Sequence, residues 1–188
     1  MKNAPPEQIK EIVLAAHGDF PQLKRLLAVA PHLYNAPHQW RENDFETPIQ
    51  AAAHTGQTAM IRYLLSLGAP LDIPTAATLG DLATLQKILA ADPQKIHDVG
   101  AHQISLLAHA AWNGDVAVTE YLWQQGARTG ITNALMTATH QEHLALIKWY
   151  LHNTEPDFTY QNMRGQTVAD LAQATGNKTI IELLTSPD

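Results

Sequence analysis

The sequence contains no cysteine, so disulfide bonds cannot hold its fold together. It also lacks long apolar runs: Ile12–Ala16 is only five residues long, with Glu11 before it and a Gly-Asp turn soon after it. A secretory signal needs a longer uncharged core, and a membrane span needs about twenty apolar residues. We therefore expect neither, and the absence of cysteine suits a reducing compartment. A soluble cytoplasmic protein is the prediction.

Positive charge is also scarce. The chain carries 12 Lys and Arg residues against 18 Asp and Glu residues, which gives a formal net charge of −6, and it has no basic run. Binding to nucleic acid or to anionic lipid requires a basic patch. We therefore expect neither nucleic acid nor a membrane as a partner. The 45% hydrophobic content is enough to build a folded core.

Catalytic motifs are missing too. The sequence has no cysteine nucleophile, no Gly-x-Ser-x-Gly turn and no glycine-rich phosphate loop, and its acidic residues are scattered rather than paired. We therefore expect no enzyme, no catalytic residue and no cofactor.

What the chain does contain is an internal repeat. A glycine followed by a polar residue recurs at Gly18-Asp19, Gly56-Gln57, Gly80-Asp81, Gly114-Asp115 and Gly176-Asn177. Each of these five turns is followed by apolar residues at helical spacing that end in an apolar pair, and a sixth pair, Tyr150-Leu151, has no glycine turn before it. The other five pairs are Leu26-Leu27, Leu64-Leu65, Ile88-Leu89, Leu122-Trp123 and Leu183-Leu184. The recurrence indicates six similar units of about 31 residues each.

The clearest unit is Thr47–Asp72, which the sequence predicts to be two short antiparallel helices. Pro48 suits the first helical turn, where a missing N–H is tolerated. Gly56 can adopt the left-handed conformation that ends a helix. The second helix has apolar residues at helical spacing, namely Met60, Ile61, Leu64 and Leu65. With its Thr-Pro-Ile-Gln-Ala-Ala-Ala-His-Thr-Gly start, this unit resembles an ankyrin repeat.

The resemblance covers almost the whole chain and implies an all-α ankyrin-repeat solenoid of stacked helix-turn-helix units with short or missing β-hairpin fingers. We expect one domain over residues 1–188, similar to bacterial-type members and capped by its terminal units. The six units span approximately 7–34, 45–70, 71–93, 103–127, 133–155 and 164–186.

The connections between units predict where fingers occur. We expect a first finger in 35–46 and a second within 96–104. Only 24 residues separate Gly56 from Gly80, compared with 34 between Gly80 and Gly114, so residues 70–76 leave no length for a finger. This short junction predicts a gap in the finger row and a bend or a split in the stack.

The ten histidines raise the question of a metal site. His140-Gln141-Glu142-His143 differs from the zinc-protease motif, in which the histidines are four apart, and a solvated turn is the preferred interpretation. His109 is expected to be a hydrogen-bonded core histidine. His17 and His54 are expected to be exposed at helix ends, where a protonated ring suits the helix dipole. We predict no metal site, although a histidine-dependent metal-binding protein or enzyme remains the alternative function.

The resemblance also implies a binding surface. Ankyrin repeats hold partners with finger tips and with the two residues between the Ala-Ala pair and the turn glycine, which form a concave row. Ala174 and Thr175 occupy that position in the last unit. The predicted partner-binding residues are Trp40, Asp44, Glu46, His54, Thr55, Thr78, Leu79, His102, Trp112, Asn113, His140 and Gln141.

The function implied is non-catalytic protein–protein interaction, with Trp112 as the anchor of the concave row. Two other interpretations stay open: Trp112 packs against a finger base, and Trp40 stiffens the long first finger. We expect a monomer that binds an unidentified protein, and the sequence does not decide between an adaptor and an inhibitor. An inhibitor or immunity-type factor is the variant of the same function that the sequence leaves open.

Overall fold

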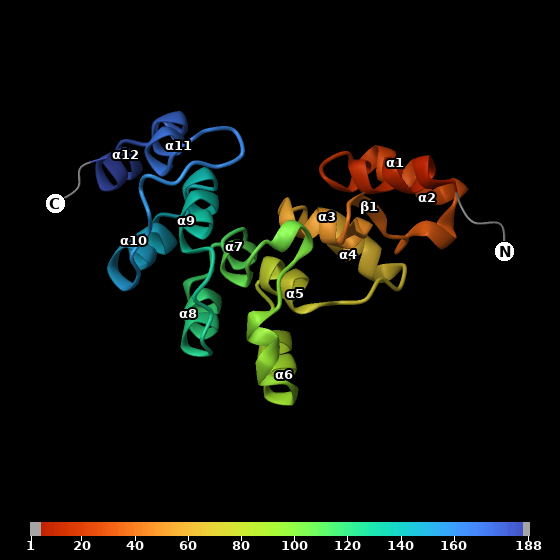
Figure 1. Cartoon of the computed structure of the whole chain (residues 1–188), viewed down its shortest axis with the longest axis horizontal. Helices are drawn as coiled ribbons and strands as arrows, with labels where there is room; N and C mark the ends of the chain where they lie inside the picture. Colours follow the sequence, from red (N-terminus) through yellow and green to blue (C-terminus); the bar gives the residue numbers. More distant parts are fainter. Residues whose placement is uncertain (1–4, 186–188) are drawn as a thin grey trace.

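The computed structural model describes residues 5–185, and within them the chain forms six pairs of α-helices that follow one another in a single file (Figure 1). The pairs are α1 (Pro6–Ala16) with α2 (Phe20–Val29), α3 (Pro48–His54) with α4 (Thr58–Ser66), α5 (Ile73–Leu79) with α6 (Leu82–Ala91), α7 (Leu106–Ala110) with α8 (Val116–Gln124), α9 (Ile131–His140) with α10 (Leu144–Asn153), and α11 (Val168–Thr175) with α12 (Lys178–Thr185). The mostly helical ankyrin-type solenoid expected from the sequence is confirmed.

The first helix of each pair packs against the first helix of the next. Contacts run from α1 to α3, then to α5, α7, α9 and α11. Alanine makes this close approach possible: Ala52, Ala76 and Ala110 have no exposed surface. The residues that end these first helices therefore form a row along one side of the stack.

Short polar residues begin the second helices. Asp19 accepts a hydrogen bond from the N–H of Gln22, Asp81 from that of Thr84 and Asp115 from that of Ala117. An aspartate at this position satisfies an N–H that a helix start leaves unpaired. The repeated Gly-Asp pairs of the sequence are therefore the junctions between a first helix and its second helix.

The first predicted finger is present. Strand β1 (His38–Arg41) pairs antiparallel with β2 (Asp44–Glu46), with His38 opposite Glu46. The hairpin turns through Asn43, whose positive φ of 61° suits asparagine. This hairpin brings its last residue, Glu46, back beside the helix row just before α3 begins.

The second predicted finger is not a hairpin, and that prediction was wrong. The segment holds two 3-10 helices, η2 (Pro93–His97) and η3 (Ala101–Gln103), and a single bridge pairs Val99 before η3 with Ser105 after it. A side chain at Gly100 would lie 2.2 Å from Nε2 of His109, so the segment is pressed against α7. Packing on the core replaces the strand pairing that a projecting finger would make.

The buried apolar residues fall into two clusters. One runs from Ile12 to Ala69 and the other from Ile73 to Leu184, so the division coincides with the short junction before α5. Helix α5 begins at Ile73, which leaves no room for a finger there, as expected. The predicted unit and domain ends at residues 1–4 and 186–188 lie outside the described residues.

Within the described part of the chain, no helix combines the length and the apolar character that crossing a membrane would require.

Candidate functional site

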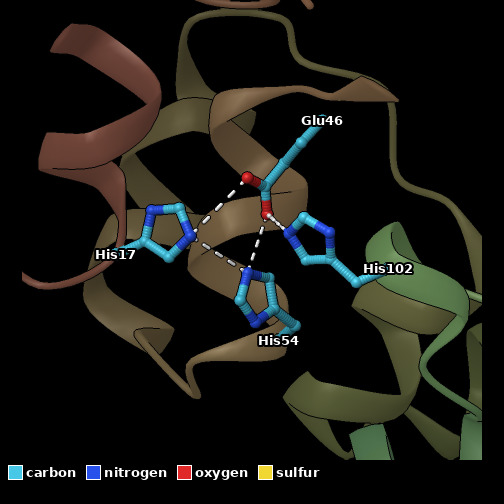
Figure 2. A group of neighbouring side chains, drawn as sticks. All are labelled: His17, Glu46, His54 and His102. Carbon is cyan, nitrogen blue, oxygen red and sulfur yellow. Dashed lines mark hydrogen bonds and ion pairs between the residues drawn. The ribbon is translucent and has the colours of Figure 1, made fainter. Parts of the chain in front are cut away.

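Four side chains from four separate elements meet at the N-terminal end of the helix row (Figure 2). They are His17, the residue that ends α1, Glu46 at the end of β2, His54 at the end of α3, and His102 in η3. One nitrogen or oxygen atom from each lies within 4.8 Å of the other three. We call this group the His/Glu cluster.

The stacking of α1 on α3 brings the first two histidines together. Both follow buried alanines at the end of a first helix, so they occupy equivalent places in successive pairs. Their Nε2 atoms are 3.2 Å apart and their rings meet edge to face. The pairing follows from the repeat itself rather than from any local motif.

Glu46 lies at the centre of the cluster and has no exposed surface. Its Oε2 accepts a hydrogen bond of 2.6 Å from the indole N–H of Trp40 and lies 3.5 Å from Nε2 of His17. Its Oε1 lies 2.7 Å from Nε2 of His54 and 3.4 Å from Nε2 of His102. Oε1 therefore lies against two imidazole nitrogens, yet it is buried without a hydrogen bond of regular geometry.

The outer nitrogens of two of the rings are also occupied. His17 Nδ1 is 2.8 Å from the carbonyl oxygen of Val13, and His102 Nδ1 is 3.1 Å from a carboxylate oxygen of Asp44. A carbonyl or carboxylate oxygen can only accept, so each Nδ1 must carry the proton. In a neutral ring, Nε2 then carries the lone pair. That of His17 lies 3.2 Å from Nε2 of His54, and that of His102 lies 3.4 Å from Oε1 of Glu46.

The surroundings of Glu46 act on its pKa in opposite directions. Burial raises the pKa, whereas His54, the indole N–H of Trp40 and the nearby His17 lower it, and the net pKa lies below the ordinary value. Glu46 is therefore an ionised carboxylate at neutral pH, as a metal ligand must be.

His102 reaches the cluster through an unusual backbone. Its φ is +58° and that of Gln103 is +61°, two consecutive left-handed residues without a glycine. Such residues are strained by about 1–2 kcal/mol each, and strain of this kind gathers at functional sites. The strained turn places His102 Nε2 3.4 Å from Glu46 Oε1, between the buried Ala101 and the exposed Gln103.

Five of the residues predicted to bind a partner belong to this cluster or its immediate support, namely Trp40, Asp44, Glu46, His54 and His102. His17 was not among the predicted site residues. The exposure predicted for His54 was wrong: only 13% of its side chain is exposed, because Glu46 and His17 cover it. Glu46, which was predicted to bind a partner, is fully buried. His17 is also partly covered, with 28% of its side chain exposed.

Thr78 does not line an exposed face either. It is 2% exposed, and its hydroxyl contacts the carbonyl oxygens of Ala53 and Pro74 and Nδ1 of His109. Helices α3 and α7 enclose it from both sides. The prediction that Thr78 contacts a partner is therefore wrong.

His109 is buried, as the sequence predicted, but only one of its nitrogens is satisfied. Nδ1 lies 2.9 Å from the Thr78 hydroxyl, while Nε2 is buried without a hydrogen bond. Burial, with a smaller contribution from His54, lowers the pKa of His109 to about 3. His109 is therefore neutral under physiological conditions.

The remaining predicted residues continue the row toward the C-terminus. Trp112 is half-buried, and its ring lies so close to Gly56 that a Cβ there would be 2.4 Å from it. Asn113 lies similarly on Gly80 and is exposed, and His140 lies edge to face with Trp112 at 6.5 Å. Gln141 is exposed, and Thr55 and Leu79 are half-buried.

The His140–His143 pair does not form a metal site with other ligands in the described part of the chain. His143 Nε2 lies 3.2 Å from the Trp112 carbonyl oxygen, and its ring covers Gly114. His140 is exposed at the end of α9. His143 therefore packs on the preceding helix pair, and His140 lies at the surface.

The ankyrin repeat family model matches residues 44–76, which contain β2, α3, α4 and the start of α5. A sequence comparison with curated proteins gave no match. The matched segment is the unit from which the ankyrin resemblance was first inferred.

Proposed function

We propose that this ankyrin-repeat protein is a non-catalytic scaffold that binds a partner protein through the C-terminal part of its concave row. An ankyrin repeat implies a protein–protein interaction scaffold, and the repeat at residues 44–76 supports that role here. The proposed contact residues are Leu79, Trp112, Asn113, His140 and Gln141, with Thr55 at the edge.

The observation that carries the proposal is the way in which Trp112 is held. Its ring rests on Gly56, its carbonyl oxygen accepts from His143, and its ring meets that of the exposed His140 edge to face. A large aromatic side chain fixed before binding loses little conformational entropy when a partner covers it. Rigid tryptophans with polar neighbours are frequent anchors of interfaces.

The N-terminal part of the row is less suited to a partner. Glu46 is fully buried, His54 and His102 lie against its carboxylate, and Trp40 donates to it, so these residues face one another and not a partner. A partner would have to break these contacts to bind there. We therefore place the partner beyond His54, from Thr55 toward Gln141.

Site-specific photocrosslinking tests this placement. A photoreactive amino acid at Gln141 is expected to crosslink one protein in the native lysate, whereas the same group at Lys87, exposed on the second helix α6, is not. With that protein purified, Trp112→Ala should weaken binding by at least about 2 kcal/mol without loss of helical content. A loss below about 0.5 kcal/mol, or equal crosslinking from Lys87, would contradict the proposal.

A further inference from the structure

We propose that His17, Glu46, His54 and His102 bind one divalent transition-metal ion, with Zn²⁺ as the best fit. This site is independent of the proposed partner surface, because it uses a different part of the row and needs no partner. An ion here is supported by the spacing of the four ligand atoms, the direction of lone pairs, the local charge and the strained backbone of His102.

The ligand atoms have the spacing of a small tetrahedral site. Zinc bonds to histidine nitrogen and carboxylate oxygen are about 2.0–2.2 Å long, which places the ligands of a tetrahedral ion about 3.3 Å from one another. The Nε2 atoms of His17 and His54 are 3.2 Å apart, and Glu46 Oε1 is 3.4 Å from His102 Nε2 and 2.7 Å from His54 Nε2. All four atoms lie within 4.8 Å of one another, so an ion among them requires side-chain movements that draw the more distant pairs together.

The donor set indicates which ion fits. Three imidazoles and one carboxylate suit zinc and its transition-metal neighbours, whereas Ca²⁺ and Mg²⁺ prefer sites made of oxygen. Four protein ligands fill a tetrahedral shell, which is typical of a structural zinc rather than a catalytic one. The inference is therefore a structural ion and not a hydrolytic centre.

The outer contacts hold the ligands as they do in zinc sites. Val13 and Asp44 accept from the Nδ1 atoms of His17 and His102, so both Nε2 lone pairs face inward. The carboxylate–histidine pair of Asp44 and His102 is the outer-shell arrangement that commonly orients a metal-bound imidazole. Trp40 fixes the second oxygen of Glu46 and leaves Oε1 for the ion.

Charge favours an ion as well. Within the described residues, histidines alone supply the potential cations near the buried Glu46 carboxylate, and no Lys or Arg pairs with it. A buried carboxylate needs a compensating charge and bonds to its oxygens. A divalent ion would bond to the unsatisfied Oε1, and its two charges would balance those of Glu46 and Asp44.

The ion would tie together parts of the fold that the core leaves separate. His17, Glu46 and His54 belong to the N-terminal pairs, whereas His102 lies in the segment before α7, beyond the division between the two apolar clusters. Metal binding would therefore link the β1–β2 hairpin to η3. This link would reduce movement of the first half of the stack against the second.

Metal titration of the purified full chain tests the site. After removal of metal with a chelator, the chain is titrated with ZnCl₂ by calorimetry, melted with and without zinc, and loaded with Co²⁺ for visible absorption. His17→Gln and His102→Gln remove one ligand each, and His152→Gln, an exposed histidine of α10, is the matched control. Circular dichroism without metal checks that each variant is folded.

We expect one zinc per chain, a higher melting temperature with zinc, and the intense cobalt bands of a tetrahedral site. His17→Gln and His102→Gln should weaken zinc binding by more than about 100-fold, beyond the effect of losing an outer-shell partner, while His152→Gln behaves as the parent. No saturable zinc binding at micromolar concentrations, weak octahedral cobalt bands, or ligand variants that bind like the control would each overturn the proposal. Should a variant fail to fold, stoichiometry and the cobalt spectrum of the parent chain decide.

Discussion

The Nε2 atoms of His17 and His54 lie 3.2 Å apart although the residues are 37 positions apart in the chain. Each ends the first helix of its pair, so the stacking of α1 on α3 turns a repeated residue into a pair of facing imidazoles. Glu46 and His102 then come from connections that differ between pairs. A solenoid can thus assemble a compact polar site from residues with no short sequence spacing.

The outer shell of the His/Glu cluster yields the first prediction. Asp44→Asn keeps the size of the side chain but removes the charge that polarises His102. Zinc affinity, measured by calorimetry, should fall by about 10- to 100-fold. Asp98→Asn, which alters an exposed carboxylate paired with Lys95, should leave it unchanged. Equal affinities for the two variants would remove Asp44 from the outer shell.

The contact between Trp112 and Gly56 yields the second prediction. Gly56→Ala introduces a left-handed alanine, at about 1–2 kcal/mol, and also pushes a methyl group into the Trp112 ring, at about 1–3 kcal/mol more. Urea denaturation should therefore show a loss of about 2–5 kcal/mol in the free energy of unfolding.

Gly176→Ala is the matched control for this change. Gly176 has nearly the same φ, +69° against +70°, but open space where the methyl group would lie. Gly176→Ala should therefore lose only the free energy that a left-handed alanine costs, about 1–2 kcal/mol. In the Trp112→Ala background, Gly56→Ala should become as mild as Gly176→Ala. Equal losses for the two glycines in the parent chain would show that Trp112 does not cover Gly56.

The buried His109 yields a pH prediction. Its pKa is about 3 in the fold against 6.5 for an ordinary histidine, so between these values the unfolded chain binds a proton that the folded chain does not. The contribution of His109 to the free energy of unfolding is therefore fully present well above pH 6.5. It falls as the pH drops, by up to about 1.4 kcal/mol per pH unit.

His109→Leu should remove this contribution to the change of unfolding free energy with pH, because leucine fills the site and Thr78 can still donate to Ala53. The free energy of unfolding is compared at pH 6.5 and 5.0 with chelator present. That range lies above the lowered pKa of Glu46, whose own stabilising effect is lost only at more acidic pH. Identical slopes in the parent and the variant would mean that His109 can be protonated in the fold.

The Gly-Asp junctions yield the fourth prediction. Asp81 accepts from the N–H and the hydroxyl of Thr84, and these bonds lower its pKa. Asp81→Ala should cost about 1 kcal/mol of stability. Gln57→Ala changes the same position before α4, where the side chain makes no cap bond, and should cost clearly less. A loss as small for Asp81 as for Gln57 would contradict a capping role.

The sequence predicted the stack, the first finger and the short junction because these depend on local signals that repeat. Alanine pairs, turn glycines and apolar stripes recur at fixed places, and Asp81 or Asp115 marks a helix start on its own. The second finger could not be predicted in the same way. Its backbone is set by packing of Gly100 against His109 and by the left-handed His102.

The cluster was missed for a related reason. Taken singly, His17 and His54 are expected to be exposed helix ends, although their equivalent positions in adjacent pairs place them side by side. That equivalence was visible in the sequence. The approach of Glu46 and His102 was not, because it depends on the path of two irregular connections. Thr78 was misplaced since regular spacing does not show that α3 and α7 close around it.

The most direct test of the metal site is a crystal structure of the full chain grown with zinc, with anomalous scattering recorded on both sides of the zinc absorption edge. The proposal predicts one strong peak within about 2.0–2.2 Å of the Nε2 atoms of His17, His54 and His102 and of a Glu46 oxygen. Ordered side chains at these four positions with no peak between them would contradict it.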